Sequence, residues 1–152
     1  MLNRRETIGR GAAVAGMLAA SGLFPQSAQA WNQTAFGGKT VQEAIKALGP
    51  AGAPVESKDV VLSAPDIAEN GAVVPLGIST TLPGIKQLLI LVEKNPSPLV
   101  AVFNTHEALE SNFMTRAKMG QSSDVYAVAI TNDGKALFSK KEVKVTLGGC
   151  GG

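Results

Sequence analysis

The sequence has few of the residues from which catalytic and metal sites are usually built. Its 152 residues include one cysteine, Cys150, and one histidine, His106. A single cysteine excludes an intramolecular disulfide and a four-thiolate metal site within one chain, and with one histidine a zinc site would need several carboxylates. No metal site is therefore predicted. The unpaired cysteine points to an intermolecular bond or to a free, reactive thiol.

Aromatic residues and net charge are also scarce. Only 5% of the residues are aromatic, so a core must be built from valine, isoleucine, leucine and alanine. The formal charge of +2 depends on the first thirty residues, which hold Arg4, Arg5, Arg10 and Glu6; without them, the 14 basic and 12 acidic residues fall to 11 of each. No basic surface remains to neutralise phosphates, which argues against a nucleic-acid partner.

The N-terminus reads as an export signal. Arg4 and Arg5 precede a weakly apolar run over residues 11–23, and Ala28-Gln29-Ala30 has the form of a signal-peptidase site. The alternative is a membrane anchor, but the run has about a dozen residues against the roughly 20 needed to span a bilayer. We therefore predict a twin-arginine signal peptide over residues 1–30, a mature chain that begins at Trp31, and a periplasmic protein exported in the folded state.

The region between residues 31 and 147 predicts an all-β domain with one short N-terminal helix. The helix is expected over residues 39–48, where Val41, Ile45 and Leu48 share one face before Gly49-Pro50 ends it. Seven β-rich runs follow, and Asp133-Gly134 is typical of a hairpin turn. Short strands with frequent turns predict an immunoglobulin-like β-sandwich of about seven strands. The runs cover residues 55–63, 71–80, 85–93, 99–105, 111–119, 124–131 and 135–147.

The last five residues, 148–152, differ from everything before them. Cys150 is flanked by two glycines on each side, which are Gly148, Gly149, Gly151 and Gly152. Glycine lacks a Cβ and adopts positive φ freely, so these residues predict a flexible, slender arm that carries the thiol to different sites in turn. An unperturbed thiol is only partly ionised at neutral pH, and no basic side chain lies in the arm to change that. Activation must come from a partner, so no catalytic residue is assigned to this chain.

The residues over 141–152, the segment 93–100 and the twin-arginine leader together resemble the SoxY family, the sulfur-carrying subunits of the SoxYZ complex of sulfur-oxidising bacteria. The resemblance implies a heterodimer with a SoxZ-like subunit and a sulfur intermediate held covalently on Cys150, with no other cofactor. It also implies that a haem enzyme, SoxXA, couples thiosulfate to Cys150, and that a hydrolase, SoxB, releases sulfate. In some pathways, a sulfane dehydrogenase, SoxCD, then oxidises the remaining sulfur.

Three other interpretations of Cys150 compete with the carrier. The cysteine could be incidental in a disordered end, could staple two chains through a disulfide in an exported structural or adhesion domain, or could serve a thiol-dependent transferase. The transferase lacks any nearby base, acid or second cysteine, which favours a non-catalytic carrier. His106, which follows a strand in Asn104-Thr105-His106, is expected to be an exposed loop residue.

Overall fold

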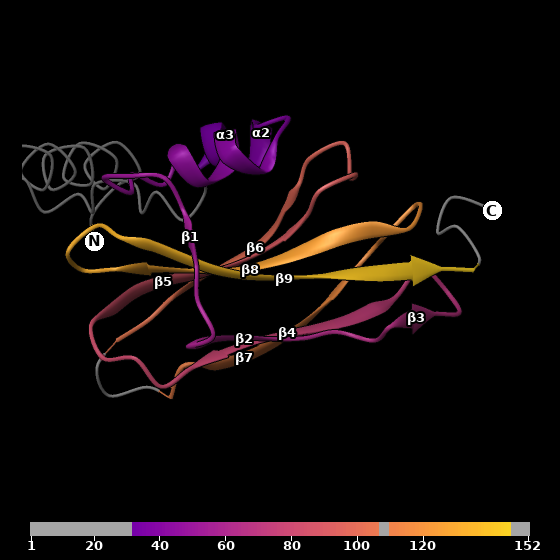
Figure 1. Cartoon of the computed structure of the whole chain (residues 1–152). Helices are drawn as coiled ribbons and strands as arrows, with labels where there is room; N and C mark the ends of the chain where they lie inside the picture. The colour runs from indigo at the N-terminus through magenta and orange to yellow at the C-terminus, as the bar shows by residue number, and fades with distance from the viewer. Residues whose placement is uncertain (1–31, 107–109, 147–152) are drawn as a thin grey trace, which may run out of the picture. The chain divides into compact units, whose positions relative to one another are not determined.

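The computed structural model describes residues 32–106 and 110–146, and residues from Gln33 onward form one compact unit. The predicted signal peptide and the predicted arm over residues 148–152 lie outside the described residues. Two short helices and nine strands are described (Figure 1). They are α2 (Gln33–Gly37), α3 (Val41–Lys46), β1 (Val55–Glu56), β2 (Val60–Ser63), β3 (Ile67–Ala68), β4 (Val74–Thr80), β5 (Ile85–Val92), β6 (Leu99–Asn104), β7 (Asn112–Ala117), β8 (Ser123–Thr131) and β9 (Ala136–Val145).

The strands form two sheets that pack face to face. The larger sheet has the order β1-β9-β8-β5-β6, with β3 added beside β9, and the smaller sheet has the order β2-β4-β7. Buried side chains from both sheets, among them Leu76 and Ile78 of β4 and Leu88 and Ile90 of β5, make one apolar cluster between them. This arrangement confirms the predicted immunoglobulin-like β-sandwich, whose core contains aliphatic side chains as the composition required.

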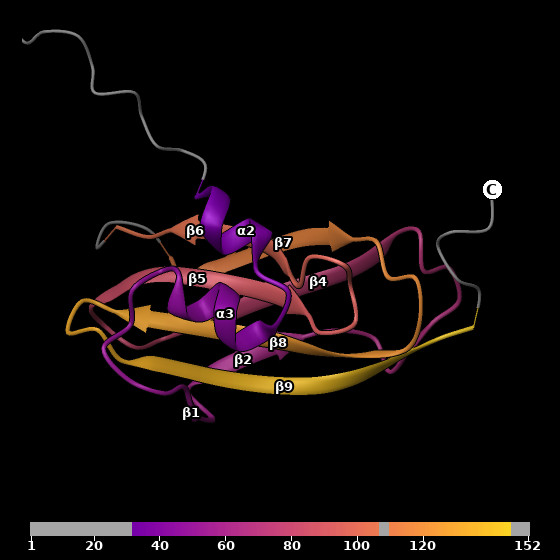
Figure 2. The ribbon, with the colours of Figure 1, turned by 90° about the horizontal axis from the view of Figure 1, so that it is seen from above.

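The second apolar cluster lies on the other face of the larger sheet. Leu89 and Leu91 of β5 point away from the smaller sheet and pack with Ala35 of α2 and Ile45 of α3. The helices therefore cover this face, as the view from above shows (Figure 2). Because β5 is buried on both faces, its sequence is a continuous apolar run instead of an alternating one.

Helix α3 confirms a helix within the predicted range of residues 39–48, but it is shorter and ends at Lys46, before Leu48. Thr40 is its N-cap, and the Thr40 hydroxyl accepts a hydrogen bond of 3.1 Å from the backbone N–H of Glu43. The Glu43 carboxylate in turn accepts one of 2.8 Å from the N–H of Lys39. Val41 and Ile45 are buried as their spacing predicted. Helix α2 was not predicted, and Phe36 at its end packs against the second cluster.

The first predicted strand run proved to be two strands in different sheets. β1 pairs with β9 in the larger sheet, whereas β2 pairs with β4 in the smaller one. Between them, the hydroxyl of Ser57 accepts from the N–H of Asp59 at 3.2 Å and donates to its carboxylate at 2.9 Å, which turns the chain. The remaining six runs each contain one of the longer strands, β4 to β9. The two-residue strand β3 was missed.

The hairpin predicted at Asp133-Gly134 is confirmed. It joins β8 to β9, which pair antiparallel, and Gly134 has a positive φ of 84°. In the part of the chain that the structure describes, no helix is both long enough and apolar enough to cross a membrane.

Candidate functional site

The candidate site is the end of β9, from which the predicted arm departs. The described chain ends at Thr146, four residues before Cys150. Cys150 and the four flanking glycines, Gly148, Gly149, Gly151 and Gly152, lie outside the described residues, so their predicted roles stay predictions. Figure 1 shows β3 lying beside the last residues of β9.

The outer edge of β9 is held by β3. Their parallel register sets Ile67 against Lys144 and Ala68 against Val145. The N–H of Lys144 donates to the carbonyl of Asp66 at 3.0 Å, and the N–H of Thr146 donates to that of Ala68 at 3.1 Å. The end of β9 is therefore paired on its outer edge, where a free strand end would otherwise fray.

The inner edge of β9 is held by a side chain. The backbone register between β8 and β9 runs as far as Ser123 opposite Val143. Two residues further along β9, the N–H of Val145 donates to the hydroxyl Oγ of Ser122 at 2.9 Å. Ser122 thus extends the pairing of the strand beyond the last backbone pair. The base of the arm is fixed from both sides.

An ion pair lies just before this base. The ammonium Nζ of Lys141 is 2.9 Å from Oδ1 of Asp66 and donates to the carbonyl oxygen of Ala64 at 2.9 Å. The hydrogen bond from Lys141 and its positive charge lower the pKa of the Asp66 carboxyl below its ordinary value. On its outer edge, β9 pairs with β1 at residues 137–138 and with β3 at residues 144–145. Lys141 lies between these two pairings, and its long side chain ties the connection between β2 and β3 to this part of β9.

The segment 93–100, singled out in the sequence, borders the same end of the sandwich. Residues 93–98 form the turn between β5 and β6, and residues 99–100 begin β6. In the turn, the N–H of Lys94 donates to the Ser123 hydroxyl at 3.0 Å. The side-chain amide of Asn95 donates to the carbonyl of Lys118 at 2.9 Å. These bonds connect the turn to the β7–β8 loop that carries Ser122. The segment is thus part of the framework around the arm base.

The reach of the thiol follows from covalent geometry. An extended residue spans at most about 3.3–3.6 Å, so four residues place Cys150 up to about 14 Å from the Cα of Thr146.

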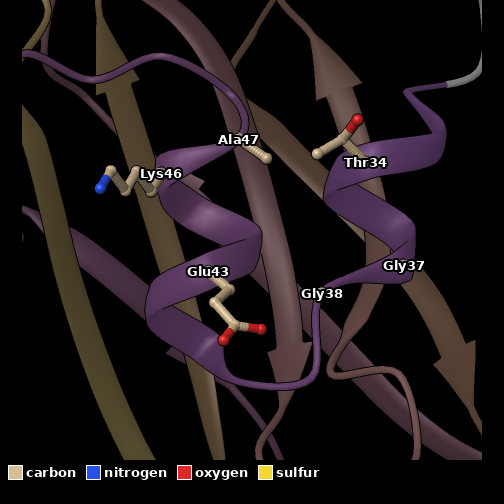
Figure 3. A pocket seen from close by; sticks show the side chains of 6 residues that line it. All are labelled: Thr34, Gly37, Gly38, Glu43, Lys46 and Ala47. Carbon is tan, nitrogen blue, oxygen red and sulfur yellow. The ribbon is translucent and has the colours of Figure 1, made fainter.

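A pocket lies between α2 and α3. It has a volume of about 550 Å³ and is lined by Thr34, Gly37, Gly38, Glu43, Lys46 and Ala47. Figure 3 shows the Lys46 side chain pointing away from Thr34 on the facing helix. The Glu43 carboxylate accepts the Lys39 N–H at the start of α3, so its role there is structural.

Metal-ligating residues do not gather in the described structure. Across residues 32–106 and 110–146, no three histidine, cysteine or acidic side chains are close enough to hold a metal ion. His106 is exposed in a loop after β6, as predicted. Together with Thr105 and Ser111 it lines a pocket that contains no residue of the arm base.

Comparison with known proteins identifies the family. The family described as "Sulfur oxidation protein SoxY" matches residues 45–150, a range that includes the base of the arm and Cys150. The chain belongs to the SoxY family. No curated protein sequence matches it.

A solved structure from the same family is similar over most of the chain. It is the sulfur carrier protein SoxY of Chlorobium limicola f thiosulfatophilum, which is 32% identical, with 71% of this chain and 97% of that chain covered and a TM-score of 0.64. Two structures of a superoxide reductase (neelaredoxin) from Ignicoccus hospitalis share the sandwich fold. They are 15% and 17% identical, cover 57% of this chain and 78% of theirs, and have TM-scores of 0.51 and 0.50.

Proposed function

We propose that this protein is a non-catalytic carrier that holds thiosulfate-derived sulfur on the thiol of Cys150 and presents it, on the arm over residues 148–152, to partner enzymes of periplasmic sulfur oxidation. The observation that carries the proposal is the position of the chain's one cysteine, four residues beyond Thr146, which directly follows a strand end that is anchored on both edges. Membership of the SoxY family supports it.

The chemistry needs only a thiol and its partners. In the loading step, Cys150 and thiosulfate form the S–S bond of Cys–S–S–SO₃⁻; two electrons pass to a SoxXA-like haem enzyme and the thiol proton is released. In the second step, water supplies the fourth oxygen of sulfate as a SoxB-like hydrolase cleaves the S–S bond to the sulfonate, leaving Cys–S–SH. The cysteine stays the tether throughout, and a SoxCD-like dehydrogenase is proposed to oxidise the sulfane sulfur that remains bound to it, with the electrons passing to the dehydrogenase and the oxygen coming from water.

The pKa of a thiol explains why the partner enzymes, and not this chain, activate Cys150. The thiolate is the nucleophile, and a thiol at its ordinary pKa is mostly protonated at neutral pH. Residues 148–152 bring no base or cation to the sulfur. The clefts of the partner enzymes therefore supply the activation, and the glycines supply reach and a thin cross-section. A SoxZ-like subunit is the proposed stable partner, carried with the folded chain through the twin-arginine route.

The test is intact mass spectrometry of the chain in complex with its SoxZ-like subunit. After incubation with thiosulfate and the haem enzyme, the mass should rise by one S₂O₃ group. Addition of the hydrolase should then leave one extra sulfur atom, removable by a thiol reductant. The control is Cys150→Ser, which should bind the same subunit and gain no mass.

The other outcomes separate the alternatives. If Cys150→Ser abolishes assembly and the wild-type chain gains no mass, the thiol is a structural staple. If the purified chain consumes thiosulfate without partners, it is a transferase. Either result refutes the carrier.

A further inference from the structure

We propose that residues 66–69, together with Ser122, form a clasp that fixes the point from which the arm departs, and that Thr146 and Ser122 are positioning residues for Cys150. The inference rests on the proposed function, because a fixed strand end matters only if Cys150 must reach the clefts of partner enzymes. It adds a requirement: the tether must have a set length and a set origin.

The first observation is that three consecutive backbone donors at the end of β9 are all used. The N–H groups of Lys144 and Thr146 point to one edge and donate to carbonyls of the clasp, while that of Val145 points to the other and donates to Ser122. Successive N–H groups of a strand alternate in this way, so both edges must be occupied to satisfy all three. Strand ends on protein surfaces are commonly satisfied by water, and this one is satisfied by protein.

The second observation is the side chain of Thr146. Its hydroxyl donates to the carbonyl of Glu69 at 3.2 Å, in addition to the bond from its backbone N–H to Ala68. Thr146 is thus held by two groups of the same segment. Just before it, Val143 is fully buried and Val145 packs against the same core cluster, which also contains Ala68. Apolar packing and hydrogen bonding end together at this residue.

The third observation is that the clasp is itself anchored. It lies in the connection that leaves β2 of the smaller sheet and returns to β4, yet it pairs with β9 of the larger sheet. Before the clasp, the carbonyl of Ala64 accepts from Lys141 at 2.9 Å. After it, the carbonyl of Gly71 accepts from the N–H of Met119 at 2.7 Å, and Met119 is fully buried. A segment tied down at both ends can hold the strand against a pull on the arm.

The consequence is a short tether. With the clasp closed, Cys150 is the fourth residue after Thr146 in the sequence. Release of residues 144–146 would add three residues, about 10 Å of extended chain. Once a tether is longer than the distance it must bridge, the effective concentration of the tethered group falls as about the −3/2 power of tether length. Lengthening the tether from four to seven residues would therefore lower the effective concentration of the Cys150 thiol about twofold.

The clasp is tested by amide hydrogen exchange, read by NMR in the complex with the SoxZ-like subunit. Thr146→Val and Ser122→Ala should each raise the exchange rates of the residue 144–146 amides about fivefold, since each removes one hydrogen bond of ordinary net strength. The double variant should raise them more than either single variant. Thr115→Val and Ser79→Ala are matched controls, because neither hydroxyl makes a hydrogen bond within the described residues. Unchanged exchange in the double variant would overturn the clasp.

Tether length is tested separately by inserting three glycines after Gly148. The insertion should leave exchange at residues 144–146 unchanged and lower kcat/KM for thiosulfate loading by the haem enzyme about twofold. The rate at which a small soluble disulfide modifies Cys150 should stay the same, because that reagent needs no fixed origin. An unchanged or higher loading rate would refute the tether argument. If the wild-type chain is never loaded, the proposed function fails instead, whatever the exchange shows.

Discussion

Lys141 and Asp66 form an ion pair, with Nζ 2.9 Å from Oδ1, that joins the connection before β3 to the strand that leads to the arm. The hydrogen bond and the charge of Lys141 lower the pKa of Asp66 from its ordinary value of 3.8. A carboxyl whose pKa is lower in the folded than in the unfolded state contributes stability above its unfolded pKa. That contribution is lost as the pH falls through the folded pKa.

The first prediction concerns this titration. The Asp66 carboxyl, followed by NMR chemical shift, should titrate with a midpoint below 3.8, and Lys141→Met should raise the midpoint to the ordinary range. Lys144→Met, on the same strand and exposed, is the control and should leave the midpoint unchanged. A normal Asp66 midpoint in the wild-type protein would show that the ion pair does not persist in solution. Because both side chains are accessible to water, global stability should change little.

The second prediction concerns the turn between β8 and β9. Gly134 has a φ of 84°, and a Cβ placed there would lie 3.3 Å from the Cβ of Ala51. Gly134→Ala should therefore lower the free energy of unfolding by about 1–2 kcal/mol, measured by urea denaturation. Gly52→Ala is the matched control, since a Cβ there meets nothing within 4 Å and its φ lies outside the unfavourable positive range. Equal stability of the two variants would contradict this description of the turn.

The third prediction concerns the helical cover of the larger sheet. Ile45 is buried against that sheet, so Ile45→Ala should lower the free energy of unfolding by about 2–5 kcal/mol through lost burial and the cavity left behind. Gln42→Ala, an exposed position on the same helix, should change it by less than about 0.5 kcal/mol. If the two variants proved equally stable, α3 would not pack as described.

The sandwich could be predicted because its signals are local. Apolar runs, alternating in several of the longer strands and continuous in β5, marked those strands. Asp133-Gly134 marked the turn between β8 and β9, and the spacing of Val41 and Ile45 marked α3. The division of residues 55–63 between two sheets could not be predicted, because strand pairing is a tertiary choice that β-propensity does not encode. Helix α2 has five residues and ends at Gly37, too short and too weak in helix propensity for a clear pattern.

The candidate site was predicted only in part. Cys150 and its glycines stand out by composition alone, and they remain predictions. The clasp was missed, because β3 has two residues, one of them the exposed Ile67, and pairs with residues 77 positions later in the chain. Ser122 was missed because a serine in a polar loop gives no sign that its hydroxyl will take the place of a strand carbonyl. Both contacts join residues that are far apart in the sequence and come together only in the folded chain.

The carrier itself is tested most directly by the intact mass of this protein isolated from cells growing on thiosulfate. We expect that a fraction of the chains carries added sulfur or a thiosulfonate group on Cys150, that reductant removes it, and that Cys150→Ser never acquires it. A Cys150 thiol that stays unmodified while the cells oxidise thiosulfate would show that this protein is not the sulfur carrier.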